Sequence, residues 1–147
     1  MLEFAILGLL QQSPMHGYEL RKELNVVLGW GRVLSYGTLY PTLKALVAAG
    51  SIQAETTPLD EAELPARGRK ARIVYQLTAE GKERFAELLE DAGPSTWDDE
   101  SFDVRFAFFS RVAVATRIRV LEGRRARLEE KLERVRRAYT TRRRGKD

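Results

Sequence analysis

Apolar side chains recur with a helical period along the first 50 residues. Leucine and isoleucine appear every three or four positions over residues 2–11 and again from about 16 to 28, which predicts two helices with one apolar face each. Pro14 separates them, because proline has no amide donor and restricts the residue before it. A third helix is predicted to end at Gly50. Its apolar stripe consists of Leu39, Leu43, Leu46 and Val47.

Pro41 fixes where this third helix can begin. The first-turn amides of a helix have no intrahelical partner, so proline is tolerated there and not further in. We therefore expect the helix to start near Gly37 or Thr38, with Thr38 as the N-cap residue. The face opposite the leucines is then smooth and almost free of negative charge. It consists of Gly37, Pro41, Lys44, Ala45 and Ala48.

Two segments that follow have strand patterns. Residues 51–56 are moderately β-prone, and residues 73–77 alternate between apolar and other side chains. The loop between them, residues 57–71, has an acidic first half and a basic second half. A fourth helix is predicted to begin after Thr78, whose side chain is a suitable N-cap, and to end at Gly93.

The carboxy-terminal part carries a different helical pattern, after a polar linker over residues 95–100. From residue 118 to 139, apolar side chains follow a strict 3–4 spacing that only Arg125 interrupts. Such a seam on a helix rich in arginine and glutamate indicates coiled-coil-like pairing. Packing against the same chain is the alternative. We favour a second chain, because an isolated helix hairpin of this size has too small a core. The residues expected in this interface are Phe102, Phe106, Phe109, Ile118, Leu121, Leu128, Leu132 and Val135.

Three helices followed by a two-stranded hairpin is the order of a winged helix-turn-helix. We therefore predict a mainly α fold with a small β-hairpin, and we divide the chain into three parts. Residues 1–92 form a winged helix-turn-helix DNA-binding domain, and residues 100–140 form a helical dimerisation region. Residues 141–147 form a basic tail that we expect to be disordered.

Charge is unevenly distributed over the 147 residues, which carry a net charge of +4. Residues 51–100 hold six basic and twelve acidic side chains, whereas residues 101–147 hold 15 basic and six acidic ones. Clustered arginines favour a polyanionic partner such as nucleic acid. A solvated basic helix face explains the charge equally well, so charge alone leaves both interpretations open.

Composition excludes several classes of site. The chain has no cysteine and one histidine, His16, which rules out disulfides, cysteine-ligated zinc and a multi-histidine metal site within one chain. It has no phosphate-binding glycine loop and no nucleophile with a credible base, so we expect no enzyme activity, metal or cofactor. The longest apolar run, residues 4–10, is too short to span a bilayer, and Glu3 stands where a signal peptide carries positive charge. We expect a soluble cytoplasmic protein with no membrane partner.

Three sequence blocks carry a family resemblance. They are Ile6-Leu7-Gly8-Leu9-Leu10 with Pro14-Met15-His16-Gly17-Tyr18-Glu19-Leu20, then Tyr36-Gly37-Thr38-Leu39-Tyr40-Pro41-Thr42-Leu43 with Leu46 and Gly50, and Arg69 with Tyr75-Gln76-Leu77-Thr78 and Gly81. In this order they resemble the PadR family of transcriptional regulators. The resemblance implies homodimeric DNA-binding regulators, usually repressors, several of which release DNA when they bind small, often aromatic, molecules. The hairpin loop is longer than the usual wing of the family, and no residues match a ligand pocket.

The expected DNA contacts lie on the third helix and the wing. The amino end of that helix has free amides and a positive dipole that suit phosphate, and its smooth face suits the major groove. The basic half of the hairpin loop is expected to face DNA, while Asp60, Glu61 and Glu63 point away. For Tyr18 we leave open core packing or phosphate contact, and for His16 a hydrogen bond at a helix start or a DNA contact. The contacts expected on a palindromic double-stranded operator are Tyr18, Ser35, Tyr36, Gly37, Thr38, Tyr40, Pro41, Lys44, Arg67, Arg69, Lys70 and Arg72.

Two tryptophans beside linkers, Trp30 and Trp97, are candidates to stack on a planar effector at a dimer interface. The leading hypothesis is a sequence-specific homodimeric repressor that a small aromatic or lipophilic effector releases from DNA. The alternative from another class is a winged-helix protein-interaction module without specific DNA binding. A polar third helix beside a basic wing favours DNA, whereas a hydrophobic face would favour protein.

Overall fold

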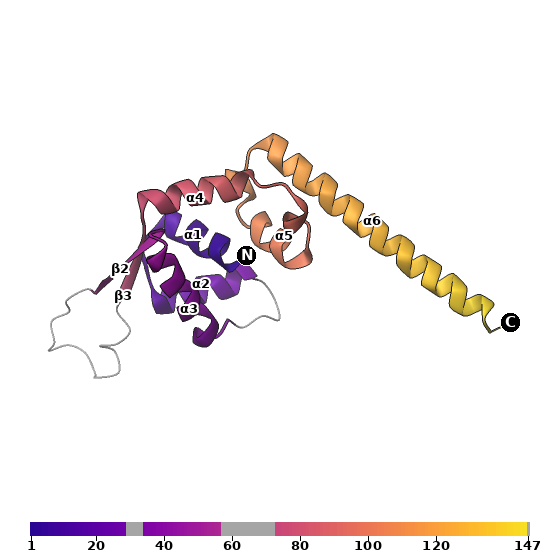
Figure 1. Ribbon diagram of the computed structural model, residues 1–147, viewed down its shortest axis with the longest axis horizontal. Helices are drawn as coiled ribbons and strands as arrows, with labels where there is room; N and C mark the ends of the chain where they lie inside the picture. The colour runs from indigo at the N-terminus through magenta and orange to yellow at the C-terminus, as the bar shows by residue number, and fades with distance from the viewer. Residues whose placement is uncertain (29–33, 57–72, 147) are drawn as a thin grey trace.

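The computed structural model describes residues 1–28, 34–56 and 73–146. The helices are α1 (Leu2–Gln12), α2 (Gly17–Leu28), α3 (Tyr36–Ala48), α4 (Ala79–Glu90), α5 (Asp99–Phe106) and α6 (Val114–Arg144). The 3-10 turns η2 (Pro94–Thr96) and η3 (Phe109–Arg111) flank α5, and the strands are β1 (Met15–His16), β2 (Ile52–Thr56) and β3 (Ile73–Leu77). The first five helices and the sheet form one body, from which α6 projects (Figure 1). The mainly α class with a small antiparallel sheet is as predicted.

Helix α1 lies at the centre of the body and is buried on every side. Residues 4–10 are all buried. The helix contacts α2, α3, α4 and β3. The prediction of a single apolar face is therefore wrong for α1. A helix that is apolar all round packs on all sides, and the other elements are built around it.

The sheet has three antiparallel strands in the order β1-β3-β2. Strands β2 and β3 form the predicted hairpin, with Ala54 opposite Tyr75. The third strand differs from the sequence prediction. Met15 and His16 form β1, with Met15 opposite Tyr75, so α2 begins at Gly17. A two-residue strand is too short to show the alternation on which a sequence pattern depends.

Helix α3 begins earlier than predicted. Ser35, not Thr38, is the N-cap residue, and Pro41 lies in the second turn rather than the first. Proline lacks the amide that would bond the carbonyl of Gly37, but Gly37 is exposed, which leaves that carbonyl open to water. The three leucines of the stripe are buried as predicted, whereas Val47 at its edge is 38% exposed.

Hydrogen bonds join the turn after α3 to the start of α4. Gly50 has a φ of 80°, a left-handed conformation that favours glycine after a helix. The Oγ1 atom of Thr78 accepts from the Gly81 amide at 3.0 Å, which confirms the predicted N-cap. The same hydroxyl donates to the Gly50 carbonyl at 2.6 Å. These contacts tie the turn after α3 to the amino end of α4.

Helix α5 and the turn after it belong to the same core as α1 and α4. Phe108 is buried, with its ring centroid 5.5 Å from that of Phe4 and 6.0 Å from that of Phe85. This packing corrects two expectations. Residues 95–100 are more than a linker, since η2 and α5 overlap them. The core of the amino-terminal body also continues to Phe108 instead of ending at residue 92.

Arg105 joins α5 to the end of α4. It is 9% exposed, its guanidinium carbon lies 4.7 Å from the ring centroid of Phe4, and its Nη1 donates to the Leu88 carbonyl at 2.7 Å. Burial lowers the pKa of Arg105, and the carboxylate of Asp91, 3.9 Å away, opposes that shift. A buried cation held by a ring and a carbonyl fixes α5 against the body.

Helix α6 has 31 residues, which corresponds to a length of about 46 Å. It runs away from the body to the carboxy terminus (Figure 1). The helix continues through Arg144, so residues 141–144 are helical and not disordered as expected. Neither α6 nor any other helix in the described ranges is long and apolar enough to cross a bilayer.

Candidate nucleic-acid interface

Helix α3 turns one side to the core and the other to solvent. Leu39, Leu43 and Leu46 are buried and hold the helix against the body. The opposite face is exposed and carries no acidic side chain. It consists of the predicted Gly37, Pro41, Lys44, Ala45 and Ala48. Small side chains and one lysine allow such a face to approach a polyanion closely.

The amino end of α3 is open. Ser35 precedes the helix, but its side chain makes no cap hydrogen bond. Its hydroxyl oxygen instead lies 3.2 Å from that of Thr38, and both residues are exposed. Exposed hydroxyls therefore sit beside helix-start amides at the positive end of the helix dipole. This arrangement can bind an anionic oxygen.

Two tyrosines and an arginine form a stack beside this face. The rings of Tyr36 and Tyr40 are 5.3 Å apart at an interplanar angle of 18°. Arg21 of α2 lies 4.4 Å from the Tyr36 ring centroid, and its Nε donates to the Leu34 carbonyl at 2.9 Å. Arg21 thus ties α2 to the start of α3. Sequence reasoning missed it, because no local pattern links α2 to Tyr36.

The sequence left two possible roles each for Tyr18 and His16, and the structure gives the place of both residues in the fold. Tyr18 is 63% exposed on α2, so it does not close the core. His16 lies in β1 and directly precedes Gly17, the first residue of α2, with its Nε2 3.9 Å from the Glu19 carboxylate. Its Nδ1 is buried without a hydrogen-bond partner among the described residues. In β3, the central strand of the same sheet, burial and the neighbouring Tyr40 raise the pKa of Tyr75.

The flank of α3 that faces α4 borders an acidic groove. Arg84 lies in it, with its Nε 2.9 Å from the carboxylate of Glu3 and its Nη1 3.5 Å from that of Glu87, and these contacts raise the pKa of Arg84. The carboxylates outnumber this one cation, so the groove repels phosphate. Ala45 of the smooth face also lines this groove, so DNA is expected on the part of that face away from the groove, at Pro41 and Lys44. The acidic residues lining the groove are Glu3, Glu80, Glu83 and Glu87.

Several expected residues lie outside the described part of the chain. They are Trp30, Arg67, Arg69, Lys70 and Arg72, together with Asp60, Glu61 and Glu63. The described part of the candidate interface is therefore α3 with its neighbours in α2. In the ranges that the structure covers, no group of three or more histidine, cysteine, aspartate or glutamate side chains is arranged to hold a metal ion.

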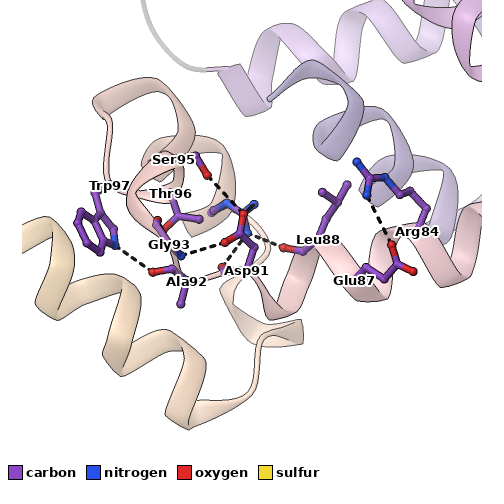
Figure 2. Close-up of polar contacts among 10 residues, drawn as sticks. Arg84, Glu87, Leu88, Asp91, Ala92, Gly93, Ser95, Thr96 and Trp97 are labelled. Atoms are coloured by element: carbon purple, nitrogen blue, oxygen red, sulfur yellow. Dashed lines mark hydrogen bonds and ion pairs between the residues drawn. The ribbon is translucent and has the colours of Figure 1, made fainter.

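Trp97 is engaged within the chain. Its indole Nε1 donates to the Ala92 carbonyl at 3.1 Å (Figure 2). The ring lies on the backbone of α6 at Gly123, where an added Cβ would come within 2.0 Å of the indole Cε2. Arg127 lies over the same indole at 5.6 Å. An effector that stacks on Trp97 has to displace one of these contacts.

The residues expected at the dimer interface form an apolar surface that is exposed along α6 and at Phe106 and half-buried at Phe102 and Phe109. Phe102, Phe106 and Phe109 pack on one another with ring centroids 5.3–6.1 Å apart. An apolar seam runs along α6, and its side chains are 44–68% exposed. Contiguous exposed apolar surface is typical of an interaction site. The α6 seam consists of Ile118, Leu121, Leu128, Leu132, Val135 and Tyr139.

Comparisons with known proteins agree with this geometry. The transcriptional regulator PadR-like family matches residues 6–87. The structure of Bacillus subtilis PadR in complex with operator DNA is 26% identical with a TM-score of 0.51, covering 95% of this chain and 78% of that one. The structure of smu.1604c from Streptococcus mutans UA159 is also 26% identical with a TM-score of 0.51, covering 95% of this chain and 76% of that one. No curated protein gives a significant match. The family match spans more than half of the chain, which therefore belongs to the PadR-like family of transcriptional regulators.

Proposed function

We propose that the protein is a homodimeric repressor that binds a palindromic operator sequence-specifically, with α3 of each protomer in the major groove. The exposed face of α3 carries this proposal, because it presents small side chains and Lys44 but no carboxylate. The complex of Bacillus subtilis PadR with operator DNA supports operator DNA as the partner of this chain. The family is one of regulators and not of enzymes, and no catalytic role is proposed.

Phosphate contacts position α3, and base contacts give it specificity. The hydroxyls of Ser35 and Thr38 and the first amides of α3 bind the DNA backbone, while Tyr40 and Lys44 flank the helix face that enters the groove. The basic half of the wing binds phosphate or the adjacent minor groove. The proposed DNA contacts are Tyr18, Ser35, Tyr36, Gly37, Thr38, Tyr40, Pro41 and Lys44 of the described part, with Arg67, Arg69, Lys70 and Arg72 of the wing.

The second copy covers the α6 seam and the phenylalanine cluster of the first. Six apolar side chains along one face of α6 are exposed in a single chain, which supports an isologous helix pairing. We assign dimerisation to residues 100–140, with Phe108 anchoring this region to the DNA-binding body. The twofold axis then places the two copies of α3 on half-sites spaced by about 10 base pairs or a multiple of that number.

The proposal includes release from DNA by a small aromatic or lipophilic effector. Such a ligand binds the DNA-free geometry more tightly than the bound one, by the full coupling free energy. Trp97 lies at the junction between the body and α6, so its fluorescence reports the event. Saturable quenching that competes with operator DNA supports this part of the proposal. No response across aromatic and lipophilic compounds contradicts it.

Fluorescence anisotropy with the promoter of the protein's own gene tests DNA binding. We expect a Kd of about 10⁻⁸ to 10⁻¹¹ M at physiological salt and a steep loss of affinity as salt rises. Equal binding to a scrambled duplex at every salt concentration rejects sequence-specific repression. A stoichiometric protein partner, captured without nucleic acid, would then favour the winged-helix protein-interaction module. The polar face of α3 argues against that alternative.

A further inference from the structure

Trp97 and Gly123 form a close contact between the body and α6. An added Cβ at Gly123 would lie 2.0 Å from Cε2 and 2.1 Å from Nε1 of the indole. Carbon atoms in ordinary contact are about 3.5–4.0 Å apart. Only glycine therefore fits at this position of α6. Glycine otherwise weakens a helix interior, so its presence in a 31-residue helix requires a reason such as this contact.

Two arginines of the next turn hold the same segment. Arg124 donates from Nη1 to the Trp97 carbonyl at 2.8 Å and also bonds the carboxylate of Asp99. The Nη1 of Arg127 lies 2.8 Å from Oδ1 of Asp98, and its guanidinium lies over the indole. One turn of α6 is thus fixed to the chain segment around η2 by a ring contact and by charge-assisted hydrogen bonds.

That segment is in turn fixed to the end of α4. Figure 2 shows Trp97 bonded to the Ala92 carbonyl and Asp91 bonded to the backbone of Gly93. Asp91 Oδ1 accepts from the Gly93 amide at 2.9 Å. Arg105 bonds both the Leu88 and the Asp91 carbonyls. A continuous series of contacts therefore runs from the end of α4 through Trp97 to Gly123.

Because the contact with Trp97 lies near the start of α6, a small displacement of the helix there becomes a larger displacement at its far end. Gly123 is about 14 Å from the start of α6, and Arg144 is about 45 Å from it, at 1.5 Å per residue. If residue 123 carries a Cβ atom, the helix has to move about 1.5 Å away from the indole before that atom lies at ordinary contact distance. With the start of α6 as pivot, the far end then moves by about 5 Å. On DNA this equals between one and two base pairs at about 3.4 Å each.

We propose that the seating of Trp97 on Gly123 sets the angle of α6 and thereby determines which half-site separation the dimer accepts. The inference rests on the proposed function, since α6 joins the two DNA-binding bodies only in the dimer. Trp97 and Gly123 are positioning residues: they touch no DNA, and they determine specificity by placing one α3 relative to the other.

The test uses Gly123→Ala with Ala126→Gly as the matched control. Ala126 is exposed on the adjoining turn, so its substitution changes helix propensity without reaching the indole. Each variant is titrated by anisotropy against duplexes whose half-site separation changes one base pair at a time. Trp97→Ala removes the indole without adding an atom, so it tests the same contact if Gly123→Ala impairs folding.

The wild type is expected to bind one separation about tenfold more tightly than separations two base pairs away, since the dimer geometry fixes half-site spacing. Gly123→Ala shifts that optimum by one or two base pairs or reduces the preference to about threefold, following the calculated displacement of α6. Ala126→Gly keeps the wild-type profile, and affinity for a single half-site stays the same in all variants. The double variant Gly123→Ala with Trp97→Ala shows the same dependence on half-site separation as Trp97→Ala alone. Wild-type profiles in both Gly123→Ala and Trp97→Ala overturn the inference.

A second measurement does not depend on DNA. The chain has no cysteine, so spin labels can be placed on Lys82→Cys of α4 and Thr141→Cys of α6 and diluted with unlabelled chain. Gly123→Ala is expected to change the distance between the labels by up to about 4.5 Å. An unchanged distance overturns the inference even if operator binding is confirmed. A changed distance without specific DNA binding by the wild type rejects the proposed function but not the seating of Trp97.

Discussion

Replacing Lys44 by alanine tests how α3 meets DNA. Lys44 is the one basic residue on the exposed face of α3, and α3 carries no acidic side chain. A lysine–phosphate contact contributes about 0.9 to the slope of log affinity against log salt. Two protomers remove two contacts, so the slope becomes less steep by about 1.8. The affinity ratio of wild type to variant then falls about 12-fold as salt rises from 50 to 200 mM. If only one protomer contacts DNA, this ratio falls only about 3.5-fold.

The assay is anisotropy with the operator duplex at four or more salt concentrations in that range. Lys82→Ala is the matched control, because Lys82 is an exposed lysine of α4 and lies outside α3. We expect the control to keep the wild-type slope. Sequence preference should change little in Lys44→Ala, because a phosphate contact carries no base information. Parallel salt dependences for wild type and Lys44→Ala would refute the placement of α3 against DNA.

Three further predictions follow from the packing and the charges. Leu128→Glu combined with Leu132→Glu puts carboxylates into the exposed α6 seam and is expected to yield monomers in sedimentation velocity; dimers that persist would contradict the seam as the interface. Phe108→Ala removes a buried ring that packs on α1 and α4, which should lower the free energy of unfolding in urea by about 3–5 kcal/mol; a loss below about 1 kcal/mol would show that the turn after α5 is not part of the core. The hydrogen bond from Arg124 lowers the pKa of Asp99, so the stabilisation is present above the ordinary aspartate pKa of about 3.9 and is lost as pH falls through the lowered value. Thermal unfolding of wild type and Asp99→Asn should therefore converge in acid, and a difference that grows as pH falls would contradict this sign.

The sequence patterns correctly predicted structural features that depend only on residues close together in the chain. The buried stripe of α3, the Thr78 cap and the break at Gly50 are each decided within one or two turns of chain. The predicted start of α3 was wrong for a physical reason. The rule that keeps proline in the first turn assumes that the unbonded carbonyl has no other partner, whereas at Pro41 that carbonyl belongs to the exposed Gly37.

Long-range packing accounts for what the patterns missed. Phe108 stands beside the spaced row of phenylalanines that we expected at the interface, yet it packs on Phe4 in the core. Nothing in the spacing distinguishes the two environments. The contact of Trp97 could not be predicted for the same reason, because it depends on Gly123 of α6, which is distant in the sequence and adjacent only in the fold. The sequence blocks did predict the family, which the match over residues 6–87 confirms.

The most direct test of the account is footprinting of the purified chain on DNA upstream of its own gene and its neighbours. The account predicts two symmetric protected segments, about 10 base pairs or a multiple apart from centre to centre, with two protomers bound per site. Protection that is uniform along the DNA, or a single protected half-site bound by one protomer, would contradict it.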